Sequence, residues 1–138
     1  MPDLRLAVAA VILAGTAYAP AASAATCPSQ DFPAFLDIFM KDVAVQQAFT
    51  ARPLQSVSID ATAEPEPKPV TRMLDKPVFP VMSDAQKQRR DGLRRTVSAQ
   101  PGGDIEVKLA GTDGDYQVRY LFRKAGCWQL YRIEDDSL

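Results

Sequence analysis

The stretch from Asp104 to Glu134 reads DIEVKLAGTDGDYQVRYLFRKAGCWQLYRIE, and it decides the fold. Apolar residues occupy every second position in three short runs of this stretch. That period of two is typical of β-strands with one buried face, because successive side chains point to opposite faces of a sheet. Gly114 and Gly126 lie between the runs, where glycine can supply the positive φ of a tight turn. The sequence therefore predicts three consecutive antiparallel strands.

The pairing of the last two predicted strands decides which side chains share a face. A three-residue loop at 124–126 places Phe122 opposite Trp128, Tyr120 opposite Leu130 and Val118 opposite Arg132. Tyr116, Tyr120, Trp128 and Arg132 then lie together, and an arginine among aromatic rings needs a carboxylate partner or a ligand. A two-residue loop instead places Arg132 beside Arg119, so this prediction depends on the register.

A phenylalanine-rich segment near the N-terminus is predicted to cover that sheet. Phe32, Phe35, Leu36, Phe39 and Val43 recur at helical spacing. Ser29 or Asp31 can cap this helix, and Asp42 can cap a short second helix over 43–49. Phe35 and Phe39 complete a candidate pocket lining with Tyr116, Tyr120, Trp128 and Arg132. The alternative is a packed core in which Arg132 only reaches the rim.

The middle of the chain carries weaker patterns. Alternation predicts a strand over 57–61, an exposed Pro- and Glu-rich connection over 62–69, and a returning strand over 70–74. A short helix is predicted over 85–93. It leads into a basic cluster that is either a partner surface for an anionic molecule or a solvated face. The cluster consists of Lys87, Arg89, Arg90, Arg94 and Arg95.

The N-terminal residues read as a cleavable signal peptide. Residues 6–18 are mostly apolar, and Ala22-Ser23-Ala24 is a small-x-small cleavage pattern. We expect cleavage after Ala24, with a site after Ala25 as the alternative. A retained membrane span is the other interpretation, but the apolar run is shorter than the roughly 20 residues that a span needs. The mature chain would then be a single domain, 25–138, without a membrane span, in the periplasm or secreted.

The two cysteines, Cys27 and Cys127, are predicted to form a disulfide. An exported protein meets an oxidising compartment in which disulfides persist. The bridge would close a loop of roughly 100 residues, worth at most about 4–5 kcal/mol on the chain-entropy model. A lipid-modified Cys27 and a pair of free thiols are the alternatives.

Composition excludes several kinds of function. The formal net charge of −1 argues against a general nucleic-acid binder, which must neutralise phosphates. The chain contains no histidine, which removes Ser–His and Cys–His nucleophilic pairs and most zinc sites. No glycine-rich phosphate loop occurs. We therefore expect no metal, no cofactor and no catalytic residue.

The two best-patterned segments resemble a known family. The helix FPAFLDIFMKD and the ending DY…YLFR…GCWQL…IEDDS are similar to an uncharacterised family of secreted bacterial proteins. That family is assigned to the nuclear transport factor 2-like superfamily. The resemblance implies an α+β fold in which a curved antiparallel sheet forms a cone covered by an N-terminal amphipathic helix. Because this superfamily includes enzymes, binders and assembly modules, the resemblance implies no particular activity.

These observations favour an exported, non-catalytic binding or interaction module. Its partner would be a small ligand or an envelope protein, and a homodimer is left open. One alternative is a small acid–base enzyme with a carboxylate and a tyrosine inside the cone. The other is an inhibitor or antitoxin-like partner of an envelope protein.

Overall fold

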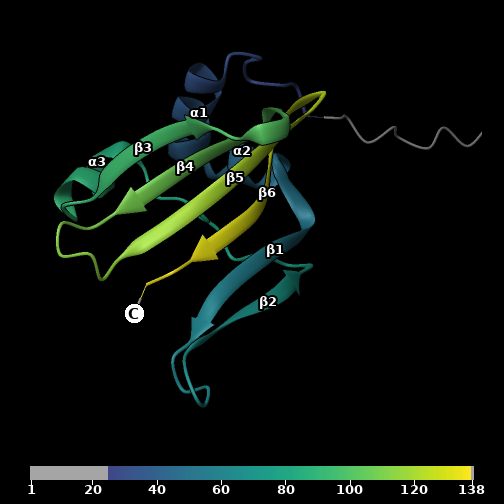
Figure 1. Cartoon of the computed structure of the whole chain (residues 1–138). Helices are drawn as coiled ribbons and strands as arrows, with labels where there is room; N and C mark the ends of the chain where they lie inside the picture. The colour runs from purple at the N-terminus through teal and green to yellow at the C-terminus, as the bar shows by residue number, and fades with distance from the viewer. Residues whose placement is uncertain (1–24, 138) are drawn as a thin grey trace, which may run out of the picture.

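A six-stranded sheet, three short α-helices and one 3₁₀ turn (η1, Pro101–Gly103) form the part of the chain, residues 25–137, that the computed structural model describes (Figure 1). The helices are α1 (Phe32–Lys41), α2 (Val43–Ala48) and α3 (Ala85–Arg90). The strands are β1 (Thr50–Asp60), β2 (Lys68–Leu74), β3 (Arg94–Ala99), β4 (Ile105–Ala110), β5 (Gln117–Ala125) and β6 (Cys127–Asp135). The predicted α+β class is confirmed. The predicted signal peptide, 1–24, lies outside the described residues.

The strands lie in the order β2-β1-β6-β5-β4-β3, so β2 and β3 are the two edges. All neighbours are antiparallel except β1 and β6, which run parallel. The sheet is curved and does not close (Figure 1). α1 and α2 cover one face of it, which we call the core face; the opposite side is the outer face.

Two aspartates start the helices that cover the sheet. The Asp31 carboxylate accepts a hydrogen bond from the amide of Ala34 (3.2 Å), and the Asp42 carboxylate accepts one from the amide of Ala44 (2.8 Å). Such caps satisfy amides that have no partner inside the helix. Pro33 is tolerated because it stands in the first turn of α1. Asp42 thus ends one helix and begins the next.

An aromatic cluster joins α1 to the sheet. Phe35, Phe39 and Phe122 are completely buried. The Phe39 and Phe122 rings meet edge to face at 5.3 Å between centroids, and the Phe32 and Trp128 rings at 5.0 Å. This geometry adds roughly 0.5–1.5 kcal/mol per pair to the burial of the rings themselves. The core therefore lies between the phenylalanine face of α1 and the middle strands.

The predicted disulfide is confirmed, and it anchors the segment before α1. Cys27 and Cys127 are bonded, with their Cα atoms 5.6 Å apart. The Gln30 side-chain amide donates to the carbonyl of Gly126 (2.9 Å), and the Trp128 indole donates to the carbonyl of Gln30 (2.9 Å). The Lys124 ammonium donates to the same Gln30 carbonyl (3.2 Å). The start of the domain is thus fixed to the β5–β6 hairpin by one covalent bond and three hydrogen bonds.

Both predicted registers of the β5–β6 hairpin are wrong. The turn is tighter than either prediction, with Ala125 paired to Cys127 around Gly126, whose φ is +75°. Phe122 consequently lies opposite Leu130 rather than Trp128.

A β-bulge then changes the face on which the rest of β6 lies. The register shifts between Leu121 and Phe122, where the extra residue on β6 is Tyr131. One extra residue reverses the alternation of side chains. Tyr120 therefore pairs with Ile133, and Arg132 pairs with Leu121 on the outer face.

Two other strands differ from expectation. β1 begins at Thr50, well before the predicted start at residue 57, and passes through Pro53. β3 follows α3 where no strand was predicted; its sequence, RRTVSA, is mostly polar, and all its residues are exposed. A strand of this kind at a sheet edge lacks the apolar alternation that marks a half-buried strand. No helix within residues 25–137 has the length and apolar character needed to cross a bilayer.

Candidate functional site

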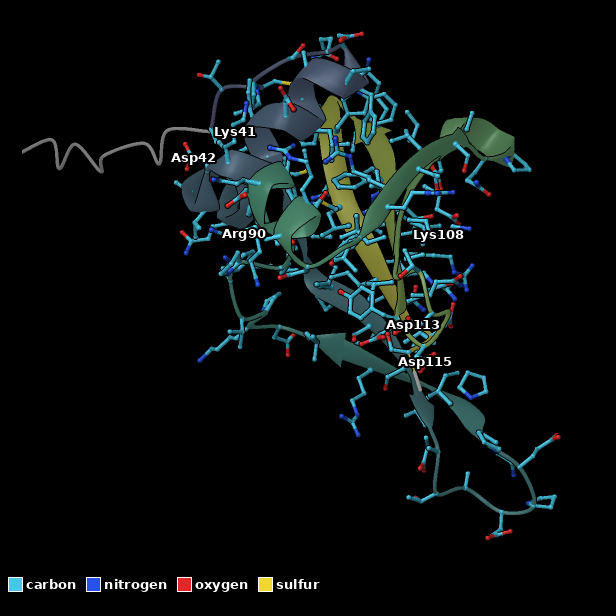
Figure 2. The ribbon with its side chains drawn as sticks, turned by 90° about the vertical axis from the view of Figure 1, so that its left-hand side faces the viewer. Lys41, Asp42, Arg90, Lys108, Asp113 and Asp115 are labelled. Carbon is cyan, nitrogen blue, oxygen red and sulfur yellow. A yellow bond between two sulfur atoms is a disulfide. The ribbon has the colours of Figure 1, made fainter. Side chains whose placement is uncertain are left out.

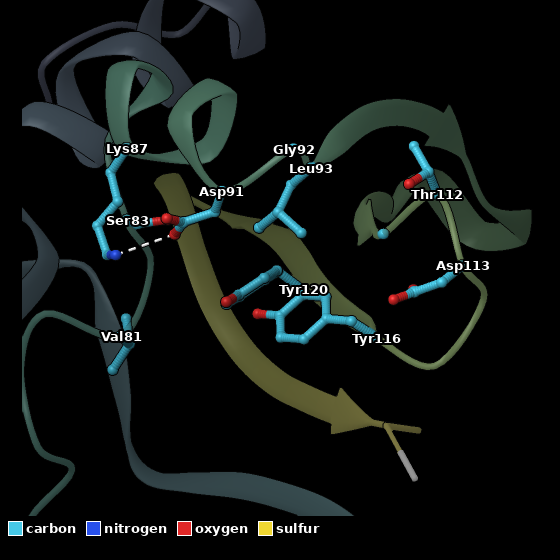
Figure 3. A pocket seen from close by; sticks show the side chains of 11 residues that line it. Val81, Ser83, Lys87, Asp91, Gly92, Leu93, Thr112, Asp113, Tyr116 and Tyr120 are labelled. Atoms are coloured by element: carbon cyan, nitrogen blue, oxygen red, sulfur yellow. Dashed lines mark hydrogen bonds and ion pairs between the residues drawn. The ribbon is translucent and has the colours of Figure 1, made fainter.

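A cavity of about 540 Å³ opens on the core face, at the end of the sheet near α3 (Figure 3). Four chain segments enclose it: the approach to α3, the end of α3, the β4–β5 loop and the start of β5. The side chains and glycines that line it are Val81, Ser83, Lys87, Asp91, Gly92, Leu93, Gly111, Thr112, Asp113, Tyr116 and Tyr120.

Gln46 holds the first of these segments in place. The oxygen of its side-chain amide accepts hydrogen bonds from the backbone amides of Val81 (2.8 Å) and Met82 (3.3 Å). The nitrogen of the same side chain donates to the backbone carbonyl of Met82 (2.9 Å). Gln46 is only 1% exposed, so these bonds are shielded from water. A side chain of α2 thereby fixes the wall of the cavity that carries Val81 and Ser83.

An ion pair stands at the end of α3. Asp84 caps this helix by accepting from the amide of Lys87 (2.8 Å). The Lys87 side chain reaches one turn along the helix, where its ammonium contacts the Asp91 carboxylate at 2.9 Å, as Figure 3 shows. Both side chains are about half exposed. The pair contributes little stability, but it makes this side of the cavity polar and electrically neutral.

Tyr116 and Tyr120 form the opposite side of the cavity. Their hydroxyl groups point the same way into the cavity (Figure 3). Burial raises the pKa of the Tyr120 hydroxyl well above its ordinary value of 10.0, with smaller contributions from Tyr116 and Asp135. Burial, followed by the charge of Asp135, also raises the pKa of Tyr116. Both hydroxyls therefore stay protonated at neutral pH, where they can donate hydrogen bonds to a ligand.

Of the six predicted lining residues, the structure brings only Tyr116 and Tyr120 into this cavity. Phe35, Phe39 and Trp128 lie in the packed core. Arg132 lies on the other face of the sheet, because the bulge at Tyr131 reverses its direction. The sequence indicated that a buried Arg132 would need a carboxylate partner or a ligand. In the structure the Arg132 guanidinium contacts the Glu134 carboxylate at 2.5 Å.

That pair belongs to an outer-face charge cluster on β4, β5 and β6. The Arg119 guanidinium contacts the carboxylates of Glu134, Asp136 (2.9 Å) and Glu106 (3.9 Å). Partial burial would lower the pKa of Arg119, but its hydrogen bond with Asp136 and the three negative charges raise it above its ordinary value. Sequence reasoning missed this cluster, although its members occupy the polar positions of alternating strands.

The predicted basic cluster is divided among different surfaces. Lys87 lines the cavity, while Arg89 and Arg90 lie exposed on α3. Arg94 and Arg95 are neighbours in β3 and therefore point to opposite faces of the sheet. The Arg95 guanidinium lies on the core face, where it donates to the side-chain oxygen of Gln88 (2.9 Å).

The cavity residues that sequence reasoning missed come from separated loops. Ser83, Leu93 and Thr112 carry no motif, and only the turn signal around Asp113 marked that loop. Within residues 25–137 no cluster of three or more His, Cys, Asp or Glu side chains could hold a metal ion. The cavity offers hydroxyl donors, one ion pair, the Asp113 carboxylate and apolar walls.

The same arrangement of sheet and helices occurs in a solved crystal structure. An NTF2-like protein from Bacteroides fragilis superposes with a TM-score of 0.54 and 23% sequence identity, covering 78% of this chain. This chain therefore has an NTF2-like fold. The match spans 47% of the Bacteroides protein, so this chain corresponds to less than half of its length. No family model and no curated protein matches the sequence.

Proposed function

We propose that this NTF2-like protein is a non-catalytic binding module that takes a small molecule into the cavity between α3 and β5. The observation that carries the proposal is the cavity itself. Its volume of about 540 Å³ lies within the range of roughly 300–1,000 Å³ typical of ligand sites. Apolar walls with a few convergent polar groups are also the usual composition of such sites.

The lining limits the chemistry of the ligand. Val81, Leu93 and the tyrosine rings offer apolar contact, and the two hydroxyls offer hydrogen bonds. Lys87 and Asp91 neutralise each other, and the Asp113 carboxylate leaves the lining with one net negative charge, which disfavours an anionic ligand. The expected ligand is a neutral, partly apolar molecule with hydrogen-bond acceptors at one end.

A fragment screen followed by protein NMR tests this proposal. Neutral fragments that combine an aromatic or alicyclic ring with a carbonyl group should shift the amide signals of residues 91–93 and 111–120. The variant Leu93→Trp, which fills the cavity, should abolish these shifts. Val78→Trp, at a site that is 86% exposed, should leave them unchanged. Fragment shifts confined to other surfaces would overturn the proposal.

A second candidate is an acid–base enzyme, because the Asp91 carboxylate and the Tyr120 hydroxyl line one cavity. In that case Asp91 would take a proton from the substrate and Tyr120 would donate a hydrogen bond to the developing oxyanion. Fragments that bind can be tested for turnover with wild-type protein and with Asp91→Asn. Turnover that disappears in this variant while binding persists would favour the enzyme.

We further infer that the protein acts after export, with residues 1–24 removed as a signal peptide. The disulfide between Cys27 and Cys127 supports this proposal, because such bonds persist in oxidising compartments. Intact-mass measurement of protein recovered from the periplasm of a bacterial host should give the mass of 25–138 with the disulfide formed. Recovery of the uncleaved chain in the cytoplasm would contradict it.

A further inference from the structure

The edge strand β3 has a free hydrogen-bonding side. It pairs with β4 along Arg94–Ala99 and ends the sheet. Within residues 25–137 its backbone makes no hydrogen bond to any other segment. An unpaired edge exposes alternate N–H and C=O groups that can receive another strand. Proteins commonly protect such edges with a proline, a bulge, a covering element or charged side chains; β3 has only the last of these, Arg94 and Arg95 at its start.

An apolar groove of about 460 Å³ runs along β3 on the core face, between the strand and α1. Val97 stands over it with 51% of its surface exposed, next to Leu36 and Met40 on the helix. The Arg95 guanidinium in this groove already donates to Gln88. Asp37, on the rim, is paired with Lys41 at 3.4 Å. The groove is therefore mostly apolar: Asp37 has an ion-pair partner, and the Arg95 guanidinium is held by hydrogen bonds to Gln88 and Met40 without a carboxylate partner.

A second groove, of about 580 Å³, runs along β3 on the outer face. Arg94 and Thr96 from β3 and Lys108 from β4 line it, and no carboxylate does. Figure 2 shows Lys108 on the side of the sheet away from the helices. Neither Arg94 nor Lys108 forms an ion pair with any residue that the structure describes. This groove thus carries two positive charges without partners.

We propose that β3 receives an extended peptide segment of a partner protein, in which apolar and acidic residues alternate. A strand added beside Arg94–Ala99 would place successive side chains on opposite faces. One set would enter the apolar groove beside Val97, and the other would meet Arg94 and Lys108. Backbone hydrogen bonds would supply affinity, and the two grooves would supply specificity, as in other cases of strand addition.

Charge argues against a second copy of this chain as the occupant. β3 carries Arg94 and Arg95 and no acidic residue. A second copy paired along β3 would bring two more arginines and no carboxylate to this edge, so Arg94 and Lys108 would stay without partners. The carboxylates of an acidic segment would instead attract Arg94 and Lys108.

Fluorescence anisotropy with a labelled peptide tests the proposal. The probe is acetyl-Ser-Val-Glu-Leu-Asp-Val-Glu-Ser-amide, and the control peptide has lysine in place of each acidic residue. Wild-type protein should bind the acidic peptide and not the lysine peptide. Arg94→Glu combined with Lys108→Glu should weaken binding at least tenfold. Lys68→Glu combined with Arg72→Glu, the same charge change on the opposite edge strand β2, should change it less than twofold.

Two N-methylated versions of the probe test the backbone pairing. Methyl groups on the odd amides of one peptide and on the even amides of the other block opposite edges of the added strand. Strand addition predicts that one version binds like the unmodified peptide and the other does not bind. Equal binding of both versions, no binding of the acidic probe at millimolar concentration, or an equal loss from the combined Lys68→Glu and Arg72→Glu variant would overturn the proposal. Circular dichroism of each variant checks that it is folded.

Discussion

The indole nitrogen of Trp128 donates a hydrogen bond to the carbonyl oxygen of Gln30 at 2.9 Å, joining residues 98 positions apart in sequence. Beside this bond lies the disulfide between Cys27 and Cys127. Together they place Phe32 against the Trp128 ring and thus set where α1 meets the sheet. The position of the phenylalanine-rich helix therefore depends on the β5–β6 hairpin.

Removing the disulfide should destabilise the domain substantially. We expect Cys27→Ser combined with Cys127→Ser to lower the free energy of unfolding by about 2–5 kcal/mol, because the unfolded chain regains the freedom of a long loop. Urea denaturation with fluorescence of Trp128 measures this change. Reduction of the wild-type protein serves as the control and should give a similar loss. Thiol titration of denatured, unreduced 25–138 should find no free thiol; two free thiols would contradict this account.

Gln46 should matter far more than its neighbour Gln47. Gln46→Ala leaves the buried amides of Val81 and Met82 without an acceptor, so we expect a loss of about 2–4 kcal/mol. Gln47 is exposed, and Gln47→Ala should change stability by less than about 0.5 kcal/mol. Chemical denaturation of the two variants gives the comparison. Equal losses would show that Gln46 does not hold the cavity wall.

The outer-face charge cluster should depend on Glu134. Glu134→Ala leaves Arg132 without a carboxylate, while Arg119 retains Asp136. Breaking a fully buried pair costs about 3–5 kcal/mol, but Arg132 is about a third exposed, so we expect about 1–3 kcal/mol. Asp37→Ala, which breaks the exposed pair with Lys41, is the matched control and should cost less than about 0.5 kcal/mol. Similar values for both variants would contradict the role of Glu134.

The free energy of unfolding should fall at alkaline pH, partly because the buried Tyr120 ionises less readily in the folded protein. Burial raises the pKa of Tyr120 above 10.0 in the folded protein, whereas the unfolded chain ionises near pH 10. Above about pH 10 the unfolded state thus binds fewer protons than the folded state, and the free energy of unfolding decreases as pH rises. The stabilisation is complete below that pH. Urea denaturation across this range should show a shallower decrease for Tyr120→Phe than for wild type; identical slopes would refute the shift.

Local patterns in the sequence predicted the features that depend only on residues close together in the chain. Asp31 and Asp42 cap the helices as expected, because a cap needs only the next three residues. The pairing of the two cysteines was predicted from the expected export, because disulfides persist in oxidising compartments. The phenylalanine spacing likewise indicated which face of α1 is buried.

The features that sequence could not predict depend on long-range pairing. The bulge at Tyr131 has no signature in the alternation, yet it moves Arg132 to the outer face. β3 was missed because an exposed edge strand carries no apolar alternation. The cavity joins Val81, Asp91, Thr112 and Tyr120, which meet only when α3 and the β4–β5 loop lie beside the sheet. No short window of sequence contains that information.

Isothermal titration calorimetry of the tightest fragment tests the central claim most directly. Measured with wild type, Tyr120→Phe, Leu93→Trp and Val78→Trp, the affinity should fall several-fold when the Tyr120 hydroxyl is lost. It should disappear when Leu93→Trp fills the cavity and stay unchanged in Val78→Trp. Undiminished binding to folded Leu93→Trp protein would contradict a ligand site between α3 and β5.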